Sequence, residues 1–235
     1  KQSLAFALLA TCIAACFLLP SLGRELLWED EAETALLARS ILVHGYPCPW
    51  DGEHLITQQG GRDFVWLGDK LVWTWHPWLQ HYLTAASFAL FGEGTTQARL
   101  PFALVGLLTV PVFFFWRARA TDPRRAMVAT LILVLSVTFL LFSRQCRYYP
   151  LLFLSGALVF WQYEGLGQLL DAKPRGGWIK LGLALGLMFW ANTLSATLVV
   201  SGLFLHSLLM LRTNRALFGR LLKSLVLLGL LASPW

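Results

Sequence analysis

Apolar residues gather into seven long segments along the chain, separated by short polar stretches. Most of these segments approach the roughly 20 residues that an α-helix needs to cross a bilayer. They cover residues 4–22, 78–91, 98–116, 126–142, 148–163, 181–211 and 221–235. The pattern therefore predicts an all-α fold, a multi-pass helical bundle in a membrane.

Two of the seven segments do not fit a single upright span. Residues 181–211 are too many for one crossing, so we expect two short helices that turn near residues 192–195. Residues 78–91 are too few, and polar His76 and His81 stand near their start. We therefore predict that this segment is an amphipathic helix on the membrane surface. With residues 181–211 counted as two helices, the number of predicted spans is seven.

Basic residues between the apolar segments indicate the topology. Eleven of the 19 Lys and Arg residues fall into three stretches, residues 117–125, 173–180 and 212–223. Cytoplasmic loops carry such an excess of positive charge. If all three stretches are cytoplasmic, an even number of crossings must separate them, and the helix assignment above satisfies this condition.

The same assignment places residues 23–97 outside, as the first external loop. Within this loop we predict two amphipathic surface helices, residues 29–43 and 77–91. A polar segment with a turn at Gly60 and Gly61 joins them.

Composition supports a membrane protein. Hydrophobic residues make up 57% of the chain and charged residues only 14%, whereas a soluble domain carries about a quarter. The net charge of +6 arises from the loop stretches rather than from one basic face, so no nucleic-acid partner is expected. We expect an integral protein of a bacterial or archaeal cell membrane, surrounded by membrane lipids, with its active site facing outward.

Acidic residues cluster just after the first apolar segment, in Trp28-Glu29-Asp30-Glu31-Ala32-Glu33. Ten of the 13 carboxylates in the chain lie between Glu25 and Glu93. Carboxylates where a span emerges are candidates for catalysis, and Asp30 and Glu31 stand at that position. Attraction to the dipole of a helix start is the alternative explanation, and Glu29 and Glu33 are expected to be solvated.

A second charged group lies on the same predicted side of the membrane, in Ser143-Arg144-Gln145-Cys146-Arg147-Tyr148-Tyr149. Arg144 and Arg147 are one helical turn apart, so we expect both to face one anion, and Arg suits phosphate. Contact with lipid headgroups is the alternative. His76, followed by Pro77, is a third candidate at the start of the second surface helix.

Four motifs in this order resemble the membrane module of the GT-C glycosyltransferases that use polyprenol-phosphate sugars, such as protein O-mannosyltransferases and the lipid A aminoarabinose transferase. The motifs are Trp28-Glu29-Asp30-Glu31, His76-Pro77-Trp78-Leu79, Arg99-Leu100-Pro101 and Ser143-Arg144-Gln145-Cys146-Arg147-Tyr148. The resemblance implies a GT-C bundle. It also implies transfer of a sugar, with inversion, from a polyprenyl-phosphate donor to a lipid, glycan or protein acceptor on the outer face.

The resemblance also implies roles for individual residues. An acidic catalytic residue in the first external loop matches Asp30, with Glu31 beside it. Basic residues near the donor phosphate match Arg144, Arg147 and His76.

Two departures from the family pattern concern the motifs themselves. Trp78 stands where the family has a second Pro. Tyr148 and Tyr149 stand where some relatives carry an Asp, which puts a metal site that needs a second carboxylate in doubt. No metal ligand and no cofactor is assigned, and a dependence on a divalent metal is left open.

Residues 1–235 are interpreted as one transmembrane catalytic module. The chain begins at Lys1 without Met and stops at Trp235 within an apolar run, so we expect it to be the N-terminal fragment of a longer protein. A transporter or flippase of a lipid-linked or anionic substrate is the main alternative function, and a membrane scaffold is another. A transporter is expected to show charge deep within its spans or two matching halves, and neither is seen.

Overall fold

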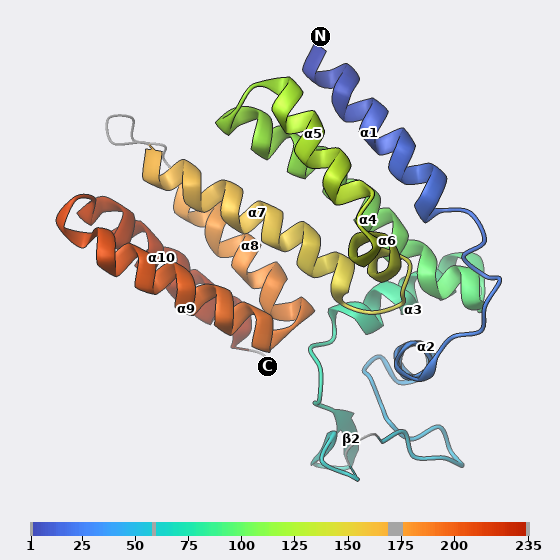
Figure 1. Cartoon of the computed structure of the whole chain (residues 1–235). Helices are drawn as coiled ribbons and strands as arrows, with labels where there is room; N and C mark the ends of the chain where they lie inside the picture. The colour runs from blue at the N-terminus through green and yellow to red at the C-terminus, as the bar shows by residue number, and fades with distance from the viewer. Residues whose placement is uncertain (1, 58–59, 169–175, 234–235) are drawn as a thin grey trace.

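The computed structural model describes residues 2–57, 60–168 and 176–233, and these are mainly helical (Figure 1). The helices are α1 (Gln2–Leu18), α2 (Glu29–His44), α3 (Leu79–Phe91), α4 (Thr95–Ala120), α5 (Pro123–Val134), α6 (Val137–Ser143), α7 (Tyr149–Gln168), α8 (Gly177–Ala191), α9 (Thr193–Leu209) and α10 (Arg215–Ala232). A 3₁₀ turn, η1 (Met210–Arg212), follows α9, and strands β1 (Phe64–Leu67) and β2 (Lys70–Trp73) form a hairpin. The predicted all-α class is confirmed, with this hairpin added.

Three apolar cores hold the described helices together, and one of them joins α2 and α3 to α4. In the first, small Ala10 and Ala14 of α1 are fully buried beside Val110 and Phe114 of α4. Small residues let helices approach closely, which favours packing in a membrane where the hydrophobic effect does not drive helices together. The second core joins α7, α8, α9 and α10.

Glycines set the distance between α8 and α10. A Cβ atom on Gly182 would lie 2.8 Å from a methyl carbon of Leu227, and one on Gly186 would lie 2.7 Å from a methyl carbon of Leu231. At either position an added Cβ atom would force the leucine side chain to move. Glycine at these two positions, one turn apart, therefore favours the close approach of α10 to α8.

The break within the long apolar segment falls where the sequence predicts it. Asn192 ends α8, and its side-chain oxygen accepts a hydrogen bond from the backbone N–H of Ser195 at 2.9 Å, which caps α9. This is the preferred role of Asn at a helix start. The predicted pair of helices with a turn near residues 192–195 is confirmed.

Residues 126–142, which the sequence predicts as one span, do not form one straight helix, and their crossing of the membrane stays a prediction. The structure has α5 and α6, which meet at an angle of 62°. Ser136 causes the break, because its hydroxyl accepts a hydrogen bond from the backbone N–H of Phe139 and so starts a new helix. Among the described residues, two helical segments are long and apolar enough to cross a membrane, Thr95–Ala120 and Thr193–Arg212, or three if the bent pair counts as one. The number of seven spans stays a prediction.

The two helices expected in the first external loop are present as α2 and α3. In Figure 1, α2 lies across the end of the bundle rather than along it, and the hairpin lies beyond it. The hairpin was missed in the sequence, although Gly68 and Asp69 between two short, mainly apolar segments are typical of a two-residue turn. That both helices rest on a membrane surface stays a prediction.

Basic and acidic segments lie at opposite ends of the bundle. The N-terminus and the connections α4–α5 and α9–α10 lie at one end, whereas α2, α6 and the hairpin lie at the other (Figure 1). Lys173 and Arg175 of the second basic stretch lie outside the described residues. This arrangement fits the charge-based topology.

The topology has a direct test. With the native cysteines replaced, a single cysteine at Asp51 should react with an impermeant thiol reagent from outside, and one at Thr121 only after the membrane is opened. Asp51 lies in the loop after α2, and Thr121 follows α4. Labelling of both positions from the same side would contradict the assignment.

Candidate active site

The acidic cluster forms the first turn of α2. The backbone N–H of Trp28, which precedes the helix, donates to Glu31 Oε2 at 3.4 Å, as in a capping box. Carboxylates here also oppose the positive end of the helix dipole. Asp30 and Glu31 are successive residues, about 100° apart round the helix axis, so they face different neighbours.

Glu31 faces inward and is fully buried. Arg99, at the start of α4, donates to both of its oxygens, from Nε at 2.8 Å and from Nη2 at 2.6 Å. The backbone N–H of Cys146 donates a third bond at 2.7 Å. A carboxylate enclosed in this way is not open to a substrate. The geometry therefore argues against the predicted catalytic role of Glu31 and points to a structural one.

Arg99 also binds the segment between α1 and α2. Its Nη1 donates to the carbonyls of Leu22 and Glu25 at 2.8 and 2.9 Å, and its Nη2 to the carbonyl of Leu26 at 3.0 Å. In the sequence Arg99 stands out only as part of a motif. The structure shows that it connects α4 both to this segment and to α2.

Arg147 is the centre of a second group, which we call the Arg147 cluster and which comprises Asp30, Glu33, His76 and Arg147. The Arg147 side chain is 3% exposed, and its Nη2 lies 3.5 Å from Asp30 Oδ2. Its Nη1 donates to the backbone carbonyl of Asp30 at 3.1 Å and to Glu33 Oε1 at 3.1 Å. The Asp30 side chain is 25% exposed, so it borders both this buried cation and the surface.

The expectation that Glu33 is solvated is wrong, because its side chain is 3% exposed. Burial raises the pKa of Glu33 to about 7, and the neighbouring Arg147 offsets only part of this effect. Glu33 Oε2 is buried without a hydrogen-bond partner in the described part of the chain. The residue lies one turn after Asp30, on the side of α2 that faces Arg147.

His76 joins the Arg147 cluster as a neutral group. Its Nε2 lies 3.2 Å from Arg147 Nη2. Burial and the charge of Arg147 lower the pKa of His76 to about 4, so the ring is uncharged at neutral pH and Nε2 accepts the hydrogen bond. The predicted role of His76 as a cation for the donor phosphate is not supported by this geometry.

Arg144 and Arg147 do not face one anion, contrary to the prediction. α6 ends at Ser143 and α7 begins at Tyr149, so the two arginines lie on the connection between these helices and not on one helical turn. The Arg144 guanidinium donates to the carbonyls of Phe17 and Pro20 at 2.5 and 2.7 Å. It therefore caps the end of α1, while Arg147 binds carboxylates.

Two polar residues of the site are missing from the sequence prediction. Asp63, in the loop before β1, is fully buried and accepts a hydrogen bond from Thr57 Oγ1 at 2.5 Å. His81 of α3 is also fully buried, and burial lowers its pKa to about 3. No local pattern marks Asp63, whereas His81 stands out only as a polar residue near the start of an apolar helix.

A metal site is not assembled by these residues. In the ranges that the structure describes, no group of three or more His, Cys, Asp or Glu side chains is placed to hold an ion. We therefore assign catalytic and phosphate-binding roles from the burial and contacts of the individual side chains.

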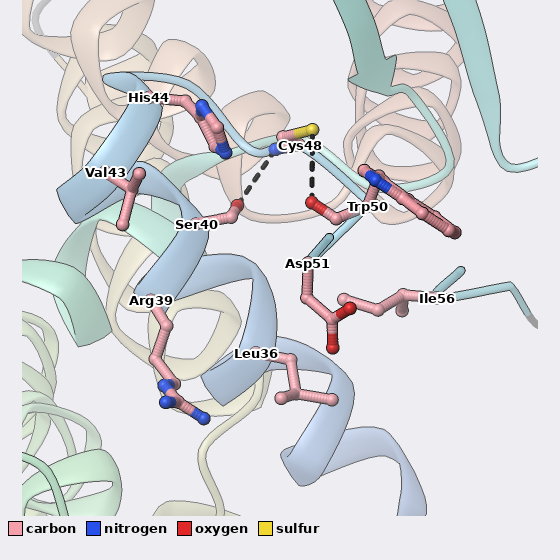
Figure 2. Close-up of a pocket in the computed structure, with 9 residues that line it drawn as sticks. All are labelled: Leu36, Arg39, Ser40, Val43, His44, Cys48, Trp50, Asp51 and Ile56. Atoms are coloured by element: carbon pink, nitrogen blue, oxygen red, sulfur yellow. Dashed lines mark hydrogen bonds between the residues drawn. The ribbon is translucent and has the colours of Figure 1, made fainter. Parts of the chain in front are cut away.

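A hollow lies on another side of α2, between this helix and the loop that follows it (Figure 2). Its lining includes apolar Leu36 and Ile56, and Arg39 at its edge forms an exposed ion pair with Glu93 at 3.0 Å. Arg39 follows Asp30 by nine residues, which places it about 180° round the helix axis. The hollow is thus separate from the Arg147 cluster.

Solved structures show the same arrangement of helices. Two crystal structures of ArnT from Cupriavidus metallidurans, one bound to undecaprenyl phosphate and one in the apo state, superpose with a TM-score of 0.69. Identity is 21% and 20%, and the superposition covers 99% of this chain but 40% of each ArnT chain. This likeness shows a shared membrane fold of the GT-C type. The chain spans about two fifths of the length of these relatives.

Sequence comparison identifies the family. No match was found among curated protein sequences. A family model described as dolichyl-phosphate-mannose-protein mannosyltransferase matches residues 75–235, which is well over half of the chain. With the GT-C fold and the order of its polar motifs, the chain therefore belongs to the dolichyl-phosphate-mannose-protein mannosyltransferase family.

Proposed function

We propose that this chain is the part of an integral membrane glycosyltransferase that carries its catalytic carboxylate. The enzyme would transfer a sugar from a polyprenyl-phosphate donor to a lipid, glycan or protein acceptor on the outer face of the membrane. The family match and the ArnT structure with undecaprenyl phosphate support a donor of this class. The position of Asp30, partly exposed beside a buried arginine, is the observation that carries the proposal.

Asp30 acts as general base in this proposal. Its carboxylate takes the proton from an acceptor hydroxyl or amine, whose lone pair forms a bond to the anomeric carbon of the donor. The bond from that carbon to the phosphate oxygen breaks, and the lipid phosphate leaves with its electron pair. Attack from the face opposite to the phosphate gives inversion. Arg147 holds Asp30 in place through its carboxylate and its backbone carbonyl.

Arg144 is the proposed contact for the donor phosphate. Its guanidinium lies where α1 ends, at the same end of the bundle as α2, and two carbonyl acceptors use only part of its five N–H groups. Arg147 is less suited, because it is 3% exposed and already binds two acids. A planar cation at the end of a span can meet a phosphate that lies at the membrane surface.

Replacing Arg144 with Gln should weaken the binding of a polyprenyl phosphate about tenfold, which corresponds to loss of about one charge-assisted hydrogen bond. Affinity is measured on the purified full-length protein with undecaprenyl phosphate. Arg24→Gln is the matched control, because Arg24 lies near the same end of the bundle with an 80% exposed side chain. Equal affinity of Arg144→Gln and the parent would contradict the assignment.

The function itself is tested in proteoliposomes that contain the full-length protein. Donors that carry mannose or aminoarabinose on undecaprenyl phosphate are supplied with membrane extracts as acceptors, and released undecaprenyl phosphate is measured. Release that requires both protein and acceptor supports the proposal, and an inverted anomeric centre in the product supports the mechanism. If the protein moves intact donor between leaflets without releasing phosphate, it is a transporter.

A further inference from the structure

Glu33 has no part in the mechanism above, although it is the acid closest to Arg147. Glu33 Oε1 lies 3.1 Å from Arg147 Nη1, whereas Asp30 Oδ2 lies 3.5 Å from Arg147 Nη2. The buried guanidinium of Arg147 thus contacts two carboxylates of the same helix. Glu33 is almost fully buried, while Asp30 is partly exposed and borders the surface. The charge of Arg147 is therefore divided between an outer and an inner acid.

The charged groups near Glu33 decide how the charge of Arg147 is shared between Glu33 and Asp30. The charged and titratable groups round it are Asp30 on α2, Asp63 before β1, His76 before α3, His81 on α3, and Arg147 and Tyr148 between α6 and α7. Burial lowers the pKa of His76 to about 4 and of His81 to about 3, and it raises that of Tyr148 to about 12. These three groups keep one protonation state at neutral pH.

We propose that Glu33 is a positioning residue for Asp30 and acts through Arg147. When ionised, it draws part of the guanidinium charge away from Asp30, which makes Asp30 the better proton acceptor. When protonated, it leaves the whole charge to Asp30. The exchanged proton goes to solvent, and no bond of the substrate changes in this step. This inference rests on the function proposed above.

The expected result is a change of transfer rate with pH. Because the pKa of Glu33 is about 7, Glu33 ionises between about pH 6 and about pH 8. The kcat of the parent enzyme should rise about tenfold over this interval, since one pKa unit of altered interaction corresponds to a factor of about ten. The KM for the donor should stay constant, because neither carboxylate binds the phosphate.

Glu33→Gln is the decisive variant, measured in full-length protein with undecaprenyl-phosphate sugar and the same acceptor. Gln keeps the size and a carbonyl that accepts from Arg147, but it carries no charge. Its kcat should stay at the low-pH level of the parent throughout. Glu29→Gln is the matched control, since Glu29 is exposed in the same turn of α2, and it should keep the rise. A purely structural role for Glu33 would lower activity equally at every pH.

Stability gives a second readout that does not depend on turnover. A carboxyl group whose pKa is raised by folding stabilises the protein in its protonated form, and this contribution is lost as pH rises through the folded pKa. The melting temperature of the parent should therefore fall between about pH 5 and about pH 8, and that of Glu33→Gln should fall less. Equal pH dependence of the two melting temperatures would overturn the inference.

The outcomes separate this inference from the proposed function. If Asp30→Asn is inactive but Glu33→Gln keeps the rise of kcat with pH, only the role of Glu33 is wrong. If Asp30→Asn transfers sugar at the parent rate, the proposed function of the site itself fails. If Glu33→Gln does not fold, Glu33→Asp replaces it: a rise of kcat with pH supports the inference, and a flat profile overturns it.

Discussion

Asp30→Asn should reduce sugar transfer by about two to four orders of magnitude, the usual contribution of a general base. Asn has nearly the size of Asp and its oxygen can still accept a hydrogen bond from Arg147, so packing in the Arg147 cluster is kept. What is lost is the ability to take a proton from the acceptor. Donor affinity and the melting temperature should therefore stay near those of the parent.

The measurement is the release of undecaprenyl phosphate by the full-length protein in proteoliposomes. Glu29→Gln removes a carboxylate from the same helical turn at an exposed position and should leave transfer unchanged. Transfer by Asp30→Asn at the parent rate would contradict the assignment. If a folded Glu31→Gln protein were inactive at the same time, the role of base would pass to Glu31.

Arg99→Met should destabilise the protein by about 3–5 kcal/mol, because it leaves the charge of Glu31 buried without its partner. Glu31 is 0% exposed and would retain only the N–H groups of Cys146 and Trp28. Glu31→Gln should cost less, since Arg99 would keep three backbone carbonyls and is 11% exposed. Comparison of the two variants thus shows whether Glu31 or Arg99 costs more stability when it is left without its partner.

Unfolding in mixed detergent, followed by circular dichroism, measures these costs. Arg39→Met is the matched control, because the Arg39–Glu93 pair is more than half exposed and such pairs contribute about 1 kcal/mol or less. A cost for Arg99→Met no greater than that for Arg39→Met would show that the buried pair does not hold α2 to α4.

Much of the backbone follows from the sequence because it depends on local chemistry. The start of α2 at Glu29 is set by acids in a first turn, and the break at Asn192 by a capping side chain. The bend at Ser136 has the same cause, but it is hidden within an apolar run that is long enough to span. The hairpin was missed because its two strands, which are short and mainly apolar, lie within a segment interpreted as polar.

The pairing of charges is harder to predict. The sequence places acids and arginines at the same end of the bundle, which the structure confirms. Which arginine meets which acid depends on how α4 and the α6–α7 connection approach α2. Glu33 was expected in solvent for this reason, since helical periodicity alone does not show that Arg147 covers that side. The role of Arg99 was missed because its partner lies 68 residues away.

Two arginines hold the segment between α1 and α2 by its backbone. Arg144 and Arg99 bind carbonyl oxygens of Phe17, Pro20, Leu22, Glu25 and Leu26, and every amino acid offers that oxygen. The exposed side chains of Arg24 and Leu26 can therefore vary with little effect on the position of α2. A residue inserted or removed here would instead shift Asp30 relative to Arg147. Apart from buried Leu22 and from Gly23, where a Cβ atom would collide with Thr96 Oγ1, the number of residues in this segment is what evolution or an engineer must preserve.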